Sequence, residues 1–349
     1  MNDFLKKTIL FFFFFFSSFL IGYDSISRYD YNRLLSKDNG ALSDIATYKI
    51  VVEKGFDGLK EEKRLASRLL TPLLSHYIYE FSKDKIRSWN PVFFSLLIVN
   101  SIFISLTCLL MSKYYKFLKI SKDKKTILLG CTSQFLFLTS FGVSSLYLAG
   151  LIDSSVCFFS FLLIYSFLSK KYLLVFLSTI FLAFSKETSF IYISFFYISY
   201  FCYQIFFEKK IIVKEFFYAA ASFILNIIII NFYILYFLKM NIYNYVFHFI
   251  DTGGAKYYVQ TLLDIPHFFI YIIPSLFFFF NGVKLFEKKF VTILFIMTLS
   301  FIFFLQFIIN LDGNSMGRYF FDFLGPFICL ISGLGFNLFF YNNINKIKF

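Results

Sequence analysis

Residues 91–111 read PVFFSLLIVNSIFISLTCLLM, a run that contains no charged side chain. A helix needs about 20 consecutive apolar residues to cross the hydrocarbon core of a bilayer. The run is long enough to do so once. We therefore expect a transmembrane helix here.

Similar apolar runs occur on both sides of this segment, at 8–22, 126–141, 151–168, 172–184, 188–207, 216–238, 265–282, 290–309 and 323–340. The composition is 58% hydrophobic, 24% aromatic and only 16% charged, whereas soluble domains carry about 25% charged residues. This excludes a soluble domain. The sequence predicts an all-α, polytopic transmembrane bundle of about ten spans, forming one integral membrane domain over residues 1–349.

The net charge of +13 could indicate a nucleic-acid partner, but the lysines lie in short loops between apolar runs. Cytoplasmic loops of membrane proteins are rich in Lys and Arg. With the N-terminus inside, every second loop is basic, so we expect both termini in the cytoplasm and no nucleic acid. The inside lysines are Lys6, Lys7, Lys113, Lys116, Lys119, Lys122, Lys124, Lys125, Lys170, Lys171, Lys209, Lys210, Lys214, Lys284, Lys288, Lys289, Lys346 and Lys348.

Two sizeable loops then lie outside, at 23–90 and 239–264. The first contains two amphipathic stretches, 42–53 and 59–74, which we expect to lie as helices along the membrane surface. Pro72 is expected to end or kink the second. The other loop contains His248, Asp251 and Lys256, for which an ordinary surface loop is the better interpretation.

Several common kinds of functional site are not indicated. The five cysteines each lie inside an apolar run, without a CxxC pair or a Cys/His cluster, so neither a zinc site nor a disulfide framework is predicted. No phosphate-binding P-loop, GxSxG or GxGxxG motif occurs, which argues against an ATP-driven pump and hydrolases of those classes.

The first candidate site lies early in the outer loop 23–90. Asp44 and Tyr48 are four residues apart and share one helix face. On these residues alone, a helix N-cap formed by Asp44, or by Ser43 before it, is the better interpretation. Arg64 and Arg68 are also four apart, and two guanidinium groups on one face suit a phosphate. The alternative for both arginines is contact with anionic lipid head groups.

Other polar residues fall at the outer ends of predicted spans. Asp153 lies at the N-terminal end of one span, where the helix dipole favours a carboxylate with or without a functional role. Lys186 and Glu187 occupy the turn between two apolar runs, where Gly, Asn or Ser would serve a simple turn. Charged groups near membrane depth cost several kcal/mol unless paired or hydrated, so we interpret this turn as functional.

Arg318 and Tyr319 stand just before the last apolar run. An arginine entering an aromatic helix needs an anionic partner. Asp312 and Asp322 are the local candidates, and a bound phosphate is the other.

The order of these pieces resembles the GT-C class of integral membrane glycosyltransferases. The matching pieces are Asp44 with Tyr48 (DxxxY), Arg68 with Pro72 (RLLTP), Asp153, Lys186-Glu187-Thr188 (KET) and Arg318-Tyr319 (RY). The resemblance covers most of the chain in topology but few residues in sequence. Members often carry a second acidic residue near the first, and Asp57 is its only rough counterpart here, so a divalent metal cofactor is left open.

The resemblance implies transfer of a sugar from a polyprenyl-phosphate donor to a hydroxyl of a glycan or lipid acceptor, on the outer face of a bacterial plasma membrane. Asp44 would then be the general base. Arg68, Lys186 or Arg318 would hold the lipid phosphate, with Tyr48, Arg64, Asp153, Glu187 and Tyr319 lining the substrate site. The alternatives are a transporter or flippase for a lipid-linked or anionic substrate and a polysaccharide polymerase or ligase.

Overall fold

The computed structural model describes residues 3–27, 44–61, 68–86, 89–118, 131–239, 269, 273–307 and 316–344. Throughout these segments the regular structure is helical, and the described chain contains no strand beyond an isolated bridge between Leu118 and Phe286. The predicted all-α fold class is confirmed.

Five helices in the described segments are long and apolar enough to cross a membrane. They are α1 (Asp3–Ser27), α6 (Pro91–Tyr114), α11 (Ser189–Tyr203) with its π-helical extension η5 (Gln204–Glu208), α12 (Val213–Tyr233) with η6 (Ile234–Leu238), and α18 (Met316–Ile344).

The predicted run 91–111 forms α6 because its start is well capped. The Asn90 side chain accepts hydrogen bonds from the backbone N–H groups of Val92 (2.9 Å) and Phe93 (3.4 Å), and Pro91 occupies the first helical position, where its missing N–H costs nothing. The helix packs against α1, α5 and α9.

Most of the other predicted spans are shorter or interrupted in the structure. Helices α9 (Asp153–Leu168) and α10 (Tyr172–Ser185) have 16 and 14 residues, whereas α17 (Lys288–Phe307), with 20, is about as long as its predicted span. The described part of the run 126–141 contains α8 (Thr132–Thr139), followed by the π-helical turn η4 (Gly142–Tyr147). The described part of 265–282 contains α15 (Ile273–Leu276) and α16 (Phe279–Val283).

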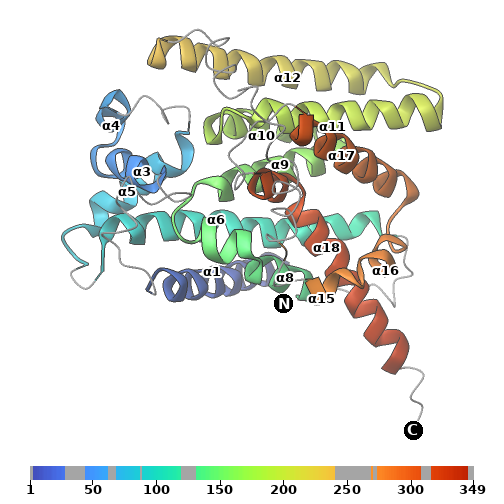
Figure 1. Ribbon diagram of the computed structural model, residues 1–349, viewed down its shortest axis with the longest axis horizontal. Helices are drawn as coiled ribbons and strands as arrows, with labels where there is room; N and C mark the ends of the chain where they lie inside the picture. Colours follow the sequence, from blue (N-terminus) through green and yellow to red (C-terminus); the bar gives the residue numbers. More distant parts are fainter. Residues whose placement is uncertain are drawn as a thin grey trace.

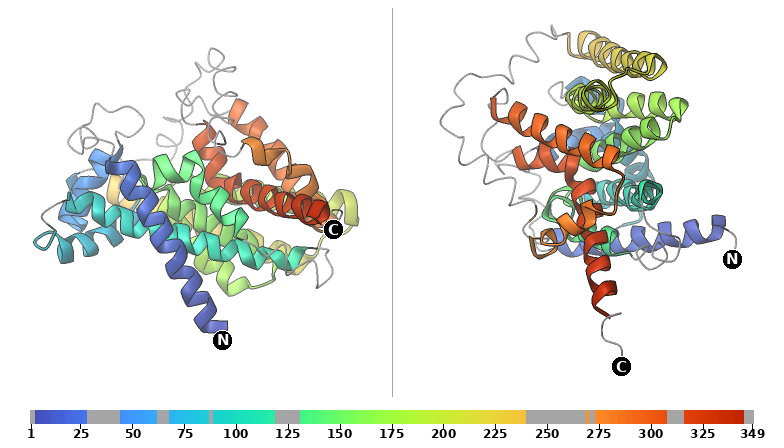
Figure 2. Two further views of the ribbon diagram at one scale, coloured as in Figure 1. Left: turned by 90° about the horizontal axis from the view of Figure 1, so that it is seen from below. Right: turned by 90° about the vertical axis from the view of Figure 1, so that its right-hand side faces the viewer.

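The outward surface of the long helices is apolar, as lipid contact requires. On α12 the exposed fractions are 72% for Phe217, 57% for Ile228 and 66% for Phe232. Helix α1 packs along α6 and is otherwise turned outward (Figure 2). These helices are those of a membrane protein.

The first loop forms a small helical group. Helices α3 (Asp44–Lys54), α4 (Phe56–Glu61) and α5 (Leu70–Ser82) gather at one end of the bundle (Figure 1). The predicted stretch 42–53 corresponds to α3. The stretch 59–74 is not one helix: α4 ends at Glu61, and Pro72 lies in the first turn of α5, where proline is tolerated, so it opens a helix instead of ending one.

The site lies where this group meets the bundle. Helix α9 begins at Asp153, α10 ends just before Lys186, and α18 begins just before Arg318. Lys170 and Lys171 follow the other end of α9, about 24 Å away at 1.5 Å per residue. The polar site and these lysines therefore lie at opposite ends of the same helix.

Candidate functional site

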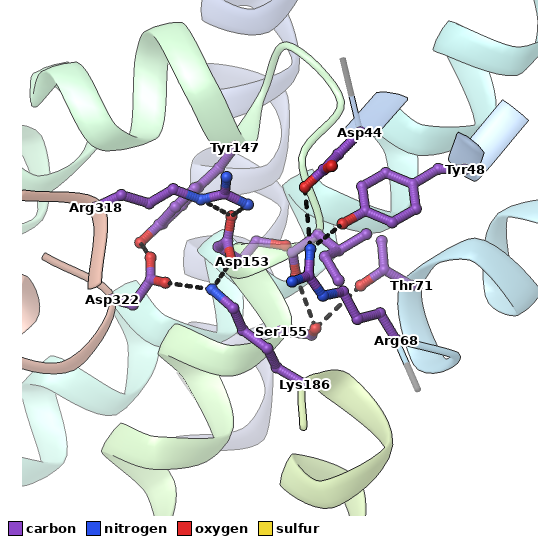
Figure 3. A network of polar contacts seen from close by, with 12 residues as sticks. Asp44, Tyr48, Arg68, Thr71, Tyr147, Asp153, Ser155, Lys186, Arg318 and Asp322 are labelled. Atoms are coloured by element: carbon purple, nitrogen blue, oxygen red, sulfur yellow. Dashed lines mark hydrogen bonds and ion pairs between the residues drawn. The ribbon is translucent and has the colours of Figure 1, made fainter. Parts of the chain in front are cut away.

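Arg68 is the centre of the first half of the site (Figure 3). Its Nε donates to both carboxylate oxygens of Glu187 at 3.2 Å, and its Nη2 donates to Glu187 Oε1 at 2.9 Å. Its Nη1 donates to Asp44 Oδ2 at 3.0 Å and to the Tyr48 hydroxyl at 3.1 Å. The guanidinium group thus joins α3 to the turn between α10 and α11.

Local backbone contacts hold Arg68 in this place. The N–H of Leu69 donates to the carbonyl of Phe184, at 2.9 Å, so the chain before α5 is fixed to the end of α10. Asp44 and Tyr48 are one turn apart on α3 and reach the same nitrogen, as their spacing predicted. The Asp44 carboxylate lies in the first turn of α3, where the helix dipole also favours it.

Asp153 is the centre of the second half. Its Oδ1 accepts a hydrogen bond from Lys186 Nζ at 2.7 Å, and its Oδ2 accepts one from Arg318 Nε at 2.7 Å. One carboxylate at the start of α9 therefore holds two cations that come from the α10–α11 turn and from α18.

Asp322 and Tyr147 also belong to the site, although neither was selected from the sequence as a site residue and Asp322 was named only as a possible partner of Arg318. Asp322 Oδ2 accepts from Lys186 Nζ at 3.2 Å, and Asp322 Oδ1 accepts from the Tyr147 hydroxyl. Asp322 was expected as a local partner of Arg318; its hydrogen bonds are instead with Lys186 and Tyr147, and Arg318 pairs with Asp153. Tyr147 offered no signal, since it is one of 25 tyrosines.

Lys186 and Glu187 are neighbours in sequence with different partners, as expected of adjacent residues. The Lys186 Nζ also lies 4.3 Å from the ring centroid of Tyr319, close enough for a cation–π interaction. A further hydrogen bond, from Thr71 Oγ1 to Ser155 Oγ at 3.0 Å, joins α5 to α9 between the two halves. The halves are therefore neighbours in one network.

Most of this network is buried. Lys186, Asp153 and Asp322 have side-chain exposures of 1%, 0% and 0%, whereas Asp44 and Arg318 keep 20% and 14%. Asp44 and Arg318 are thus the charged groups through which a substrate could first meet the network.

Burial and pairing set the pKa values of the groups in the loops. Burial opposes the charged form of Glu187, but the charge and hydrogen bonds of Arg68 outweigh it and lower the pKa of Glu187 to about 2. Burial raises the pKa of Tyr48 to about 12, against the opposing effect of Arg68. Burial also disfavours the Arg68 cation, yet Glu187 and Asp44 hold its pKa well above the ordinary value. The Arg68–Glu187 pair is therefore charged at neutral pH.

The remaining sequence candidates are placed as follows. Arg64, His248, Asp251 and Lys256 lie outside the described residues. Asp57 forms an exposed ion pair with Lys60 at 2.7 Å and not with any described residue of the network, so it does not supply a second acidic residue there.

The residues present do not fit a divalent metal ion. The described part of the chain contains no group of three or more His, Cys, Asp or Glu side chains arranged to hold one. The network carboxylates of Asp44, Asp153, Glu187 and Asp322 each already face a cation. We therefore derive no metal-dependent step.

A second, separate polar cluster lies at the other end of the bundle. Glu215, on α12, accepts hydrogen bonds from the Tyr200 hydroxyl (2.6 Å) and Gln204 Nε2 (2.8 Å), and lies 3.2 Å from Lys170 Nζ. It fixes the ends of α9, α11 and α12 together.

Comparison with known proteins adds no relative. Neither protein-family models nor curated protein sequences match this chain.

Proposed function

We propose that the protein is a membrane glycosyltransferase that moves a sugar from a polyprenyl-phosphate donor to an acceptor hydroxyl. The observation that carries the proposal is the convergence of Asp44, Tyr48, Arg68, Asp153, Lys186, Glu187, Arg318 and Tyr319 in one network. Eight of the nine site residues selected from the sequence meet there, and the ninth, Arg64, is not described.

The energetic argument favours a function for this network over a role in stability. Removing charges from water costs several kcal/mol per ion, and well-packed apolar residues often replace a buried ion pair without loss of stability. A chain so rich in apolar residues could fill this space with Phe or Leu. Ionisable groups retained at this depth mark a substrate site by default.

The chemistry of the network matches the proposed transfer. The acceptor hydroxyl loses its proton to the Asp44 carboxylate as its oxygen bonds to the anomeric carbon of the sugar. The bond between that carbon and the phosphate oxygen breaks, and the polyprenyl phosphate leaves with the electron pair. Cations near the leaving phosphate stabilise the charge that develops there.

The proposed membrane arrangement follows the loop charges. We place the network on the outer face of a bacterial plasma membrane, with about ten spans and both termini in the cytoplasm. The separation of the network from Lys170 and Lys171 along α9 supports this sidedness.

A direct assay tests the proposal against transport. The purified protein in proteoliposomes is given a panel of polyprenyl-phosphate sugars with candidate acceptors, and release of polyprenyl phosphate is measured beside movement of labelled lipid across the bilayer. Acceptor-dependent release supports the proposal. Movement of the intact lipid-linked sugar without release would identify a flippase instead.

A further inference from the structure

A groove of about 380 Å³ opens between α4, α12 and the segments that lead into the polar network. It is lined by Phe56, Leu59, Leu69, Phe184, Ile228, Ile229, Phe232 and Tyr233, and no polar atom of these residues faces it. Its volume is in the range of small-molecule sites, about 300–1,000 Å³. A sugar or a nucleotide would lose hydrogen bonds to water in such a groove, so a hydrocarbon chain is the ligand that fits.

The groove has a buried floor and a mouth toward the outer surface of α12. The floor residues Leu59, Leu69 and Tyr233 are almost inaccessible. The mouth residues Ile228 and Phe232 belong to the exposed apolar surface of the helix, which suits contact with lipid. A chain can therefore enter the groove from the hydrocarbon of the bilayer without crossing a polar surface.

The wall of the groove continues directly into the network. Leu69 follows Arg68 in sequence, and Phe184 precedes Lys186 by two residues. The N–H of Leu69 donates to the carbonyl of Phe184 at 2.9 Å. The two segments that supply these cations to the network therefore also form the wall against which a chain would pack.

The groove lies at the same end of the bundle as the network. Ile228 is about 20 Å along α12 from Glu215, at 1.5 Å per residue. Glu215 pairs with Lys170, which follows the end of α9 opposite Asp153. A lipid whose polar head reaches the network can therefore place its chain in the groove.

We infer that the groove binds the hydrocarbon chain of the lipid-linked donor, in the part next to its phosphate. The identity of the lipid as a prenyl phosphate rests on the proposed function. In a prenyl phosphate the anion is joined to the hydrocarbon without a polar glycerol between them, and Arg68 is likewise joined to the groove without an intervening residue. The inference gives α4 and α12 a binding role and makes Leu69 and Phe184 the contacts through which a bound chain holds the network segments in place.

Photo-cross-linking locates the chain directly. The probe is farnesyl phosphate with a diazirine on its middle isoprene unit, and the purified full-length protein is reconstituted in nanodiscs. We expect mass spectrometry to find adducts on the groove residues of α4 and α12. Excess farnesyl phosphate should remove them, whereas excess phosphatidylglycerol or farnesol should not. Adducts confined to other helices would overturn the inference.

A variant that fills the mouth provides the second measurement. Ile228→Trp should weaken farnesyl phosphate binding about tenfold, the effect of leaving roughly 60 Å² of chain surface unburied. Ile224→Trp is the matched control, because Ile224 is on the same helix and 55% exposed, against 57% for Ile228, but does not line the groove. Both positions face outward, so the ligand-free Tm of both variants should stay near that of wild type. Equal affinities of the two variants would contradict the assignment.

The outcomes separate this inference from the proposed function. If the groove is labelled and Ile228→Trp loses binding, but no sugar transfer occurs with any donor, the groove stands and the glycosyltransferase proposal fails. If sugar transfer occurs but the adducts lie elsewhere, the groove assignment fails alone. Competition by phosphatidylglycerol would assign the groove to membrane phospholipid, and competition by farnesol to any hydrocarbon chain; either result overturns its assignment to the donor.

Discussion

Arg68 and Glu187 form a bidentate ion pair across 119 residues of sequence, with Nη2 and Oε1 2.9 Å apart. Both side chains are nearly inaccessible, at 7% and 3% exposure. The pair fixes the first-loop helices to the turn between α10 and α11, and so determines where Asp44 lies relative to the cations of the bundle.

Arg68→Met should strongly destabilise the protein. The substitution leaves Glu187 buried and without its bidentate partner, a loss of about 3–5 kcal/mol for a broken buried pair. Thermal unfolding in detergent measures it. The double variant Arg68→Met/Glu187→Leu should recover most of the loss, because it removes the fully buried carboxylate, while Asp44, which also loses Arg68, keeps 20% exposure and can be hydrated.

Lys60→Met supplies the control for this comparison. Lys60 and Asp57 form an ion pair with exposures of 74% and 77%, and exposed pairs contribute little, so no measurable shift of Tm is expected. An Arg68→Met protein as stable as wild type would show that the buried pair does not hold the loop in place.

The stabilisation by Glu187 should depend on pH in one direction. Its pKa falls from 4.5 to about 2 on folding, so the unfolded chain binds its proton first as the pH drops. The contribution is fully present above about pH 4.5 and is lost as the pH falls toward 2. The Tm difference between wild type and Glu187→Gln should stay constant from pH 8 to 5 and shrink below pH 4.5. A difference that is unchanged at pH 3 would contradict the assignment.

Asp153→Asn should cost more stability than Asp322→Asn. Asp153 neutralises both Lys186 and Arg318, so its loss falls in the range of about 3–5 kcal/mol for a broken buried pair. Asp322→Asn leaves Lys186 paired with Asp153 and keeps an amide oxygen for the Tyr147 hydroxyl, so a loss of about 1–2 kcal/mol is expected. Tm values in one detergent decide the order, and equal or reversed losses would argue against Asp153 as the shared partner.

Glu215→Gln should lower the stability of the protein without changing its KM for the sugar donor. Glu215 is bonded to Tyr200, Gln204 and Lys170 at the opposite end of the helices from the network. The Tm should fall while KM for the donor stays within about twofold of wild type. A larger KM change would place part of the donor site at that end.

The long apolar helices and the polar residues of the candidate site could be predicted from the sequence, because both depend on local sequence patterns. The charge-free run 91–111 matches α6, and the four-residue spacing of Asp44 and Tyr48 places both on Arg68. Apolar length alone does not show that, in the described part of the run 126–141, α8 ends at Thr139 and η4 follows it. At Gly142 an added Cβ would lie 2.5 Å from Phe321 Cδ1, so η4 packs too closely on α18 for a bulkier residue.

The pairing within the site was not predictable, because it depends on how distant helices pack. Asp322 was a local candidate for Arg318, yet Arg318 bonds Asp153 across 165 residues; the other local candidate, Asp312, lies outside the described residues. Pro72 was expected to end or kink a helix, and its position in the first turn of α5 depends on where that helix begins. Sequence spacing cannot show which carboxylate a cation reaches once five helices meet at one place.

Sugar transfer by Asp44→Asn tests the central claim most directly. A positioned general base contributes about 10²–10⁴-fold, so kcat should fall at least about 100-fold while farnesyl phosphate affinity stays near that of wild type. Asp57→Asn, an exposed carboxylate of the same loop, should retain full activity. Transfer by Asp44→Asn at the wild-type rate would contradict the assignment of Asp44 as the base.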